Sequence, residues 1–282
     1  MGIALGAALL QSGDVEHIAF FGRSLEPPPH PMFDSPAAGE PPMVEYRAGL
    51  IPPPRNTNAL ILAVPDSALA EVAHDLAAAG PAPPGCAALH VSGAISTDVL
   101  APLHAAGYAI GSFHPLQTVA DPWFSAARLT GIAFAIAGDP PAILAARRLA
   151  NALDGIPLVI PPNLRPVYHA AAVTASNYVV AVVAAACRLL EQAGVAPDAT
   201  LPSLLPLVEG TVDNLKRLGI HGALTGPIAR GDVDTVRLHL ARLSPDERPL
   251  YSALGREVLG IARAAGLDAR KADEIEDLLG TA

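Results

Sequence analysis

The stretch ALILAVPDSALAEVAHDLAAAGPAPPGCAALHVSGA, residues 59–94, places a helical segment between two short apolar runs. Each apolar run is long enough for a buried strand, and Gly80 follows the helical segment as a C-terminal cap. A strand, a helix and a second strand in this order form a crossover unit, whose two strands lie parallel in one sheet. The stretch therefore predicts a parallel α/β sheet.

The alternation continues on both sides of this unit. On the N-terminal side, the sequence predicts a small-residue helix over residues 1–11 that ends at Gly13, and a buried strand over residues 17–23. The proline-rich residues 26–54 are expected to form surface loop around one short strand, MVEYR, because prolines lack the N–H donors that a central strand needs. The C-terminal side continues with a helix at 97–106 and strands at 108–113, 132–138 and 156–160, and Asp139 with Pro140 opens a helix between the last two.

After residue 161 the alternation stops and the apolar residues follow a helical period. We therefore expect a Rossmann-like α/β domain over residues 1–161 and an all-helical domain over residues 162–282. The expected helices cover 166–192, 203–219, a segment from Asp232, 245–265 with Ser244 and Glu247 as a capping box, and 272–279.

Composition excludes several classes of function. With 18 basic and 27 acidic residues, the formal net charge of the 282-residue chain is −9, and no basic run is present, so nucleic-acid binding is not expected. Cys86 and Cys187 are the only cysteines, and they lack the spacing of metal ligands. They fit a reducing cytoplasm, and no targeting segment is visible at the start of the chain. Only Lys216 and Lys271 are lysines, which limits the candidates for a catalytic lysine.

The uncharged run at residues 170–187 is long enough to span a membrane. It consists mainly of Ala and Val, contains Thr174, Ser176 and Asn177, and lacks Leu, Ile and Phe. We therefore predict a buried helix of a soluble protein, with no membrane partner.

The expected nucleotide site lacks its usual glycine-rich turn. A dinucleotide domain normally opens on a strand and a G-x-G-x-x-G turn, whereas this sequence opens on Met1 and Gly2. We interpret Gly2 as the last glycine of that fingerprint and the first strand as missing upstream; a native domain that starts with a helix is the alternative. At the end of the expected second strand stand Gly22, Arg23 and Ser24, and an arginine at this place favours the 2′-phosphate of NADP.

Further candidates follow the expected strands, at the sheet edge where ligands of open α/β folds bind. Val64 and Pro65 lie after one strand, and Ser92 with Gly93 follows the next and permits close backbone approach to a nicotinamide. His114 lies on the turn after the third and is a candidate substrate-binding residue. A core histidine satisfied by neighbouring backbone is the other interpretation of His114.

The helical half carries polar residues in apolar surroundings. His169 and Asn177 are eight residues apart and share one face of the expected helix, with Ser176 beside it. Such groups bind either a substrate or a neighbouring helix. Further along the chain, Thr225 and Arg230 precede an expected helix; Arg230 can clamp a carboxylate, and Asp232 can be only the N-cap of that helix.

The sequence contains four segments that together resemble a known family. They are HVSGA at 90–94, GSFHPLQT at 111–118, YHAAAVTASNY at 168–178 and LTGPIARGD at 224–232. In this order they resemble the bacterial family with a Rossmann-like domain followed by the domain DUF2520. That family is similar to the ketopantoate reductase, pyrroline-carboxylate reductase and 6-phosphogluconate dehydrogenase superfamily, in which a nucleotide domain precedes a helical dimerisation domain. The resemblance implies a homodimer that binds NADP and a small-molecule substrate.

The resemblance also implies roles for individual residues. Where the superfamily places a catalytic lysine, this sequence has His169, which as an imidazolium would protonate the developing alkoxide. Asn177 would orient the substrate oxygen, while Thr225, Arg230 and Asp232 would close the cleft around a substrate carboxylate. The expected activity is NADP-dependent reduction of a small 2-oxo acid similar to ketopantoate. The alternatives are an imine or 3-hydroxyacid oxidoreductase and a nucleotide-binding regulatory protein without catalysis.

Overall fold

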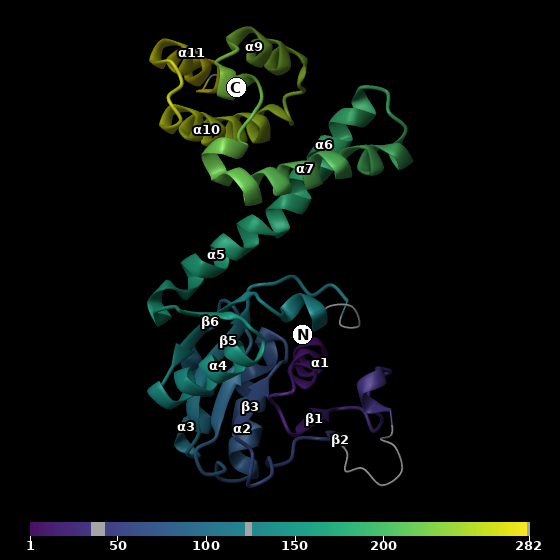
Figure 1. Cartoon of the computed structure of the whole chain (residues 1–282), viewed down its shortest axis with the longest axis vertical. Coiled ribbons are helices and arrows are strands. Elements are labelled where there is room, and N and C mark those ends of the chain that lie inside the picture. Colours follow the sequence, from purple (N-terminus) through teal and green to yellow (C-terminus); the bar gives the residue numbers. More distant parts are fainter. Residues whose placement is uncertain (35–42, 122–125, 281–282) are drawn as a thin grey trace. The chain divides into compact units, whose positions relative to one another are not determined.

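The computed structural model describes residues 1–34, 43–121 and 126–280. The chain divides into two compact units, Met1–Val179 and Val180–Ala282. The first is an α/β unit with a Rossmann-like sheet and the second is helical, as the sequence predicts (Figure 1). The units divide inside a helix, and the predicted domain boundary at residue 161 stays a prediction.

The first unit is built on a five-stranded sheet with the strand order β3-β4-β5-β6-β7. The strands β3, β4 and β5 are parallel, as predicted, and so are β6 and β7, but β6 runs antiparallel to β5. The prediction of a wholly parallel sheet is therefore wrong at this pair. A parallel pair needs a crossover, and in the described residues between β5 and β6 only the short 3-10 turn Ala126–Leu129 intervenes. The strands are Ala59–Leu62, Ala87–His90, Ala109–Pro115, Ala133–Gly138 and Ile156–Val159.

Helices cover both faces of this sheet. Helix α1 (Gly2–Ser12) and helix α4 (Pro140–Ala152) pack on one face around Phe113 and Phe134, whose rings stack at 4.6 Å. Helices α2 (Leu69–Ala79) and α3 (Ala101–Ala105) pack on the other face, and a 3-10 turn precedes each of them, at Asp66–Ala68 and Thr97–Leu100.

Asp139 precedes α4 as predicted, but its side chain does not cap that helix. The Asp139 carboxylate instead accepts a hydrogen bond of 2.9 Å from the backbone N–H of Ile110 in β5. The residue therefore joins α4 to the neighbouring strand.

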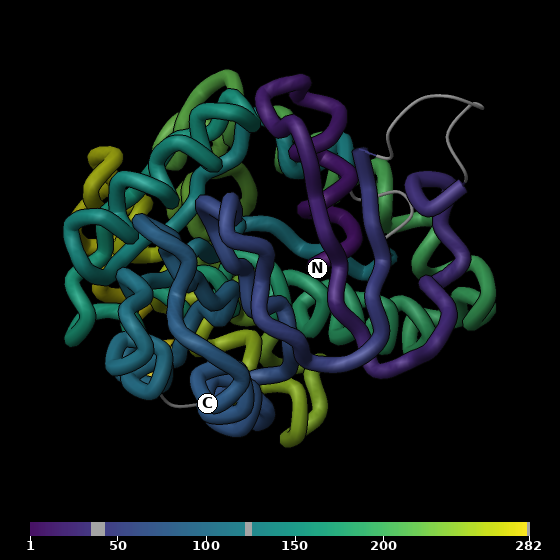
Figure 2. The backbone as a smooth tube through the Cα atoms, turned by 90° about the horizontal axis from the view of Figure 1, so that it is seen from below, coloured from purple at the N-terminus to yellow at the C-terminus, as the bar shows by residue number. Residues whose placement is uncertain are grey.

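A second, two-stranded parallel sheet pairs β1 (Ile18–Gly22) with β2 (Val44–Ala48), which run side by side in Figure 2. Helix α1 ends at Gly13, whose φ of 78° is the left-handed cap that the sequence predicts. Gly6 lets α1 pack closely on β1, because a Cβ at this position would overlap the Phe20 ring. These elements bring the N-terminus of α1 to the end of β3, where a Cβ at Gly2 would lie 3.0 Å from the Cβ of Ala63.

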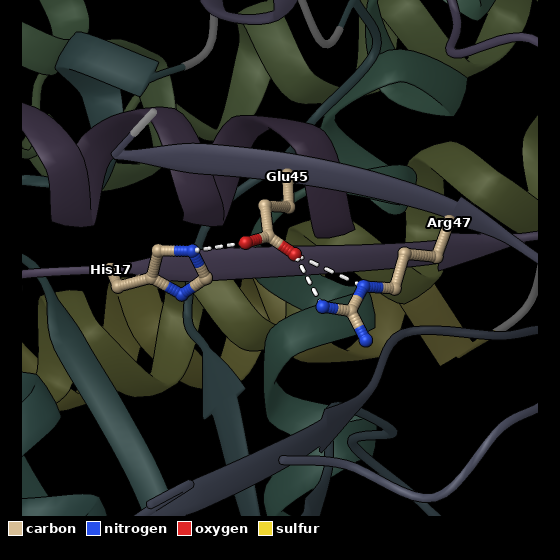
Figure 3. A network of polar contacts seen from close by, with 3 residues as sticks. All are labelled: His17, Glu45 and Arg47. Carbon is tan, nitrogen blue, oxygen red and sulfur yellow. Dashed lines mark hydrogen bonds and ion pairs between the residues drawn. The ribbon is translucent and has the colours of Figure 1, made fainter. Parts of the chain in front are cut away.

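A polar network joins β2 to the start of β1 (Figure 3). The Glu45 carboxylate accepts hydrogen bonds from Nε and Nη2 of Arg47 at 3.0 and 2.6 Å, and it lies 3.2 Å from Nε2 of His17. The hydrogen bond from Arg47 holds the pKa of Glu45 below its ordinary value. All three side chains are partly exposed, so we expect the network to add little to stability.

The predicted helix over 166–192 is interrupted. Helix α5 (Arg165–Ala175) ends at Ser176, whose φ of −121° and ψ of −73° are not helical, and α6 (Asn177–Gln192) begins directly after it. Contrary to the prediction, this run is not buried within the single chain. By length and composition the segment Pro162–Gln192 could cross a membrane, and none of its most apolar stretch is buried inside the chain.

In the second unit, α7 (Pro197–Ala223) is broken at Gly219, where φ is 68°. A small core formed by Ile228, Val236, Leu259 and Ile275 holds the last helices together. The Glu247 carboxylate accepts a 3.0 Å hydrogen bond from the backbone N–H of Ser244, which is half of the predicted capping box. These helices are α8 (Pro227–Arg230), α9 (Val233–Arg242), α10 (Arg248–Ala264) and α11 (Ala269–Gly280).

Candidate functional site

Three imidazoles gather where the carboxyl ends of β4 and β5 meet the start of α5. His90 is the last residue of β4, Gly93 lies in the loop after it, and His114 lies near the end of β5. Tyr168 and His169 extend from the first two turns of α5. All five residues belong to the first compact unit.

Arg165 fastens α5 to this edge of the sheet. Its side chain is completely buried. Its Nε donates to the carbonyl oxygen of Ile95 at 3.0 Å, its Nη1 donates to Oγ of Ser112 at 2.7 Å, and its Nη2 donates to the carbonyl oxygen of Ser92. No carboxylate in the described part of the chain forms an ion pair with it, so its charge acts on the neighbouring imidazoles.

Gly93 lets two imidazoles pack directly against its backbone, because it has no side chain. A Cβ on Gly93 would lie 2.5 Å from Nδ1 of His169 and 2.9 Å from Nε2 of His114, so two ring nitrogens converge on it. The Nδ1 of His169 is buried and has no hydrogen-bond partner among the described residues. Because buried polar atoms are nearly always paired, the unpaired Nδ1 indicates that a ligand binds here.

Burial sets the protonation of the surrounding groups. It lowers the pKa of His90 to about 4, with a smaller contribution from the Arg165 charge. It also lowers the pKa of His114 to about 4, with His169 and Arg165 as further causes. Burial raises the pKa of Tyr168 to about 12. At neutral pH, the imidazoles of His90 and His114 are therefore uncharged and the phenol of Tyr168 keeps its proton.

The Ser92 side chain organises the loop around Gly93. Its Oγ donates to Oδ2 of Asp66 at 2.9 Å and accepts hydrogen bonds from the backbone N–H groups of Ala94 and Ile95 at 3.3 and 3.1 Å. These contacts occupy the hydroxyl. The N–H of Ser92 donates to Nδ1 of His90, and its carbonyl oxygen accepts from Arg165, so Ser92 holds the loop in place. Asp66, Arg165 and Tyr168 were not among the residues that the sequence analysis selected.

The predicted cofactor residues Arg23, Ser24 and Gly2 belong to the same unit and lie after β1 or near the end of β3. Arg23 and Ser24 are exposed directly after β1, and the Tyr46 hydroxyl donates to the Ser24 carbonyl oxygen at 2.9 Å. Gly22 leaves room for that hydroxyl, since a Cβ there would overlap it. Gly2 approaches the end of β3, beside Val64 and Pro65.

The other predicted residues lie on other elements of the chain. Ser176 and Asn177 lie at the junction of α5 and α6, and the break there removes the continuous helical register that the prediction of a shared face with His169 requires. Thr225 and Arg230 belong to the second compact unit, which is described by itself. Asp232 is the N-cap of α9 and accepts a 3.1 Å hydrogen bond from the N–H of Thr235, which confirms its capping interpretation.

Two family models match the sequence. The Rossmann-like domain model covers residues 49–115, and the model for DUF2520, a domain of unknown function, covers residues 132–258. Both domains that the resemblance names are therefore present. Among curated proteins, no significant match is found.

Several solved structures have a similar fold. Protein TM1727 from Thermotoga maritima is 22% identical, with a TM-score of 0.67 over 93% of this chain and 96% of its own. BF3122 from Bacteroides fragilis, named as a candidate NADP oxidoreductase, is 21% identical, with a TM-score of 0.61 over 93% and 92%. The pyrroline carboxylate reductase of Plasmodium falciparum, solved with NADP bound, is 14% identical, with a TM-score of 0.55 over 99% and 94%. At these identities the similarity establishes the fold alone.

Proposed function

We propose that the protein is an NADP-dependent oxidoreductase that reduces the carbonyl group of a small 2-oxo acid similar to ketopantoate. The observation that carries the proposal is the convergence of Nε2 of His114 and Nδ1 of His169 on Gly93. They meet at the sheet edge where Rossmann-like domains bind their ligands. The names of two proteins with this fold, one a candidate NADP oxidoreductase and one solved with NADP, support the choice of cofactor.

Residues at the start of α1 and after β1 would hold a nicotinamide dinucleotide. The exposed guanidinium of Arg23 and the hydroxyl of Ser24 are suited to a 2′-phosphate, and Gly2 lies at the N-terminus of α1, where no side chain caps the backbone N–H groups. When bound, the cofactor supplies a hydride to the carbonyl carbon.

The chain itself supplies the proton. As the hydride reaches the carbonyl carbon, the C=O π electrons move to the oxygen, which becomes an alkoxide. His169 transfers a proton from its ring to that oxygen, the product is a hydroxyl group, and the imidazole regains its proton from solvent. The orienting role expected of Asn177 and Ser176 stays a prediction, because the break at Ser176 interrupts the helical face that they would share with His169.

Two alternative functions are compatible with the same fold. An imine or 3-hydroxyacid oxidoreductase would use the same proton donor on a different acceptor atom, and a regulatory protein would bind the nucleotide without turning it over. The substrate and the kinetics, rather than the fold, distinguish these three functions.

The decisive measurement is NADPH oxidation, followed by absorbance, with the purified protein and a panel of 2-oxo acids, cyclic imines and 3-hydroxyacids, the last assayed with NADP. We expect turnover with a branched 2-oxo acid such as ketopantoate, and weaker turnover when NADH replaces NADPH. Turnover only with imines or only with 3-hydroxyacids would select the first alternative. NADPH binding without turnover on any compound would select the regulatory function, and absence of both would refute all three.

We further propose that the active form is a cytoplasmic homodimer that buries the apolar face of α6. Tyr178, Val179 and Val180 are 58%, 45% and 70% exposed in the single chain. Residues 170–187 carry no charge, so two copies of this face do not repel each other. The polar residues Thr174, Ser176 and Asn177 and the break between the helices favour a second protein surface over a bilayer.

Light scattering after gel filtration tests this dimer. The protein is expected to have twice the mass of one chain, and the Val180→Asp variant the mass of one chain, because a buried carboxylate at the interface is strongly unfavourable. Leu144→Asp on α4, also exposed at 52%, is the matched control and should leave the dimer intact. A monomeric wild-type protein, or one that sediments with lipid vesicles, would contradict the proposal.

A further inference from the structure

We propose that Tyr168 fixes the tautomer of His114, so that His114 presents an Nε2–H donor to the oxygen of the substrate carbonyl. Tyr168 is thus a positioning residue and His114 the group that contacts the substrate. The inference rests on the proposed reduction of a carbonyl group.

The geometry of the pair is well defined. The Tyr168 hydroxyl on α5 lies 2.7 Å from Nδ1 of His114 on β5. The two rings meet edge to face, with centroids 5.6 Å apart and an interplanar angle of 86°. Because Arg165 fastens the first turn of α5 to the same loop, the phenol is held against the imidazole by buried contacts.

The number of available protons determines the direction of this hydrogen bond. The phenol has one proton, and Nδ1 of His114 is its only hydrogen-bond partner among the described residues. A neutral imidazole has one N–H, on either nitrogen. If Nδ1 carried it, the phenol proton would have no acceptor in this half-buried place, so the phenol donates to Nδ1 and the imidazole proton resides on Nε2.

Nε2 of His114 and Nδ1 of His169 lie close to each other beside the backbone of Gly93. A Cβ on Gly93 would lie 2.9 Å from Nε2 of His114 and 2.5 Å from Nδ1 of His169. The two nitrogens are close enough for one substrate oxygen beside Gly93 to contact both rings. The two imidazoles then have different tasks: His114 stays neutral and stabilises the developing oxyanion with a hydrogen bond, while His169 transfers the proton.

The surroundings of His114 keep it neutral over a wide pH range. The titratable and charged groups that face it are Tyr168, His169 and Arg165 from α5, His90 from β4 and Asp66 from the turn after β3. Burial, with smaller contributions from His169 and Arg165, outweighs the carboxylate of Asp66, so the pKa of His114 is lowered to about 4. A donor that does not change protonation near neutral pH suits an oxyanion contact.

The position of the proton can be measured without substrate. In long-range ¹H–¹⁵N spectra of the histidine rings, we expect His114, assigned by its loss in His114→Gln, to show the Nε2–H tautomer at neutral pH. In Tyr168→Phe, the ¹⁵N resonance of Nδ1 is expected to move downfield, because an unprotonated ring nitrogen loses its hydrogen bond. An Nδ1–H tautomer in the wild-type protein, or an unshifted Nδ1 resonance in the variant, would overturn the inference.

Kinetics test the second half of the inference. For the best substrate of the panel, Tyr168→Phe is expected to lower kcat about tenfold, with little change in KM for NADPH. The effect is smaller than that of removing an oxyanion donor, because the His114 ring stays in place. Tyr251→Phe on α10 is the matched control, because the Tyr251 hydroxyl makes the same kind of contact with Nδ1 of His239 at 2.8 Å, and it should retain kcat. A Tyr168→Phe enzyme with unchanged kcat would overturn the inference. A wild-type protein with the expected tautomer but no turnover would refute the proposed function, and with it the role towards a carbonyl, while the tautomer assignment would stand.

Discussion

Replacing His169 by glutamine is expected to lower kcat for carbonyl reduction about 10²- to 10⁴-fold, the usual contribution of a positioned general acid. Glutamine keeps a polar amide near the position of the ring but has no proton to transfer at neutral pH. The Nδ1 of His169 is buried and lacks a hydrogen-bond partner among the described residues, so we place it beside the substrate carbonyl. The substitution should therefore lower kcat and leave the affinity for NADPH unchanged. Steady-state NADPH oxidation measures kcat, and NADPH fluorescence titration measures cofactor affinity.

The control for this variant is His74→Gln on α2. The His74 side chain is 76% exposed, so its replacement should leave kcat within about twofold of the wild-type value. If His169→Gln binds NADPH normally but does not turn over an accepted substrate, the regulatory alternative fails. If His169→Gln keeps kcat within the same range as the control, another group supplies the proton.

The parts of the fold that could be predicted from the sequence depend on local patterns. Alternating apolar runs and helical segments predict β3, α2 and β4, and the glycine after residues 1–12 predicts the end of α1. The direction of β6 could not be predicted from its own residues, because it depends on how the chain returns from β5. The break at Ser176 was missed because the apolar pattern continues through it without a proline or a glycine.

In the candidate site, too, only some of the residues could be predicted from the sequence. Gly93, His114 and His169 could be selected because histidines and glycines at strand ends and in an apolar helix are unusual. Arg165 and Tyr168 were missed, since an arginine at the start of a helix normally lies in solvent and its burial is a tertiary effect. The spacing in the sequence could have identified Arg165. It stands four residues before His169, at the start of a helix marked by Pro166, so Arg165 and His169 lie on one face of that helix.

The second large effect is expected from Arg165→Met, which should lower the free energy of unfolding of the α/β unit by about 3 kcal/mol or more. The substitution leaves the carbonyl oxygens of Ser92 and Ile95 and the Oγ of Ser112 without their donor. Each buried acceptor left unpaired costs about 1–3 kcal/mol. Removing a buried charge recovers part of this cost, and the three unpaired acceptors outweigh that gain. Urea unfolding followed by circular dichroism, with hydrogen exchange of the β4 and β5 amides, measures the change.

The pH dependence of this effect separates the charge of Arg165 from its packing. In the folded protein the pKa values of His90 and His114 are lowered from 6.5 to about 4, so the unfolded chain binds more protons between these values. The contribution of these two histidines to the free energy of unfolding is therefore fully present above about pH 6.5. It falls as the pH is lowered towards 4, by at most about 1.4 kcal/mol per pH unit for each histidine. Because Arg165 contributes to lowering both pKa values, this decline should be shallower in Arg165→Met than in the wild-type protein.

The matched control is Arg147→Met, which replaces an exposed arginine on α4. It should change the free energy of unfolding by no more than about 0.5 kcal/mol at any pH. An Arg165→Met variant as stable as this control would show that the buried guanidinium does not hold α5 against the sheet.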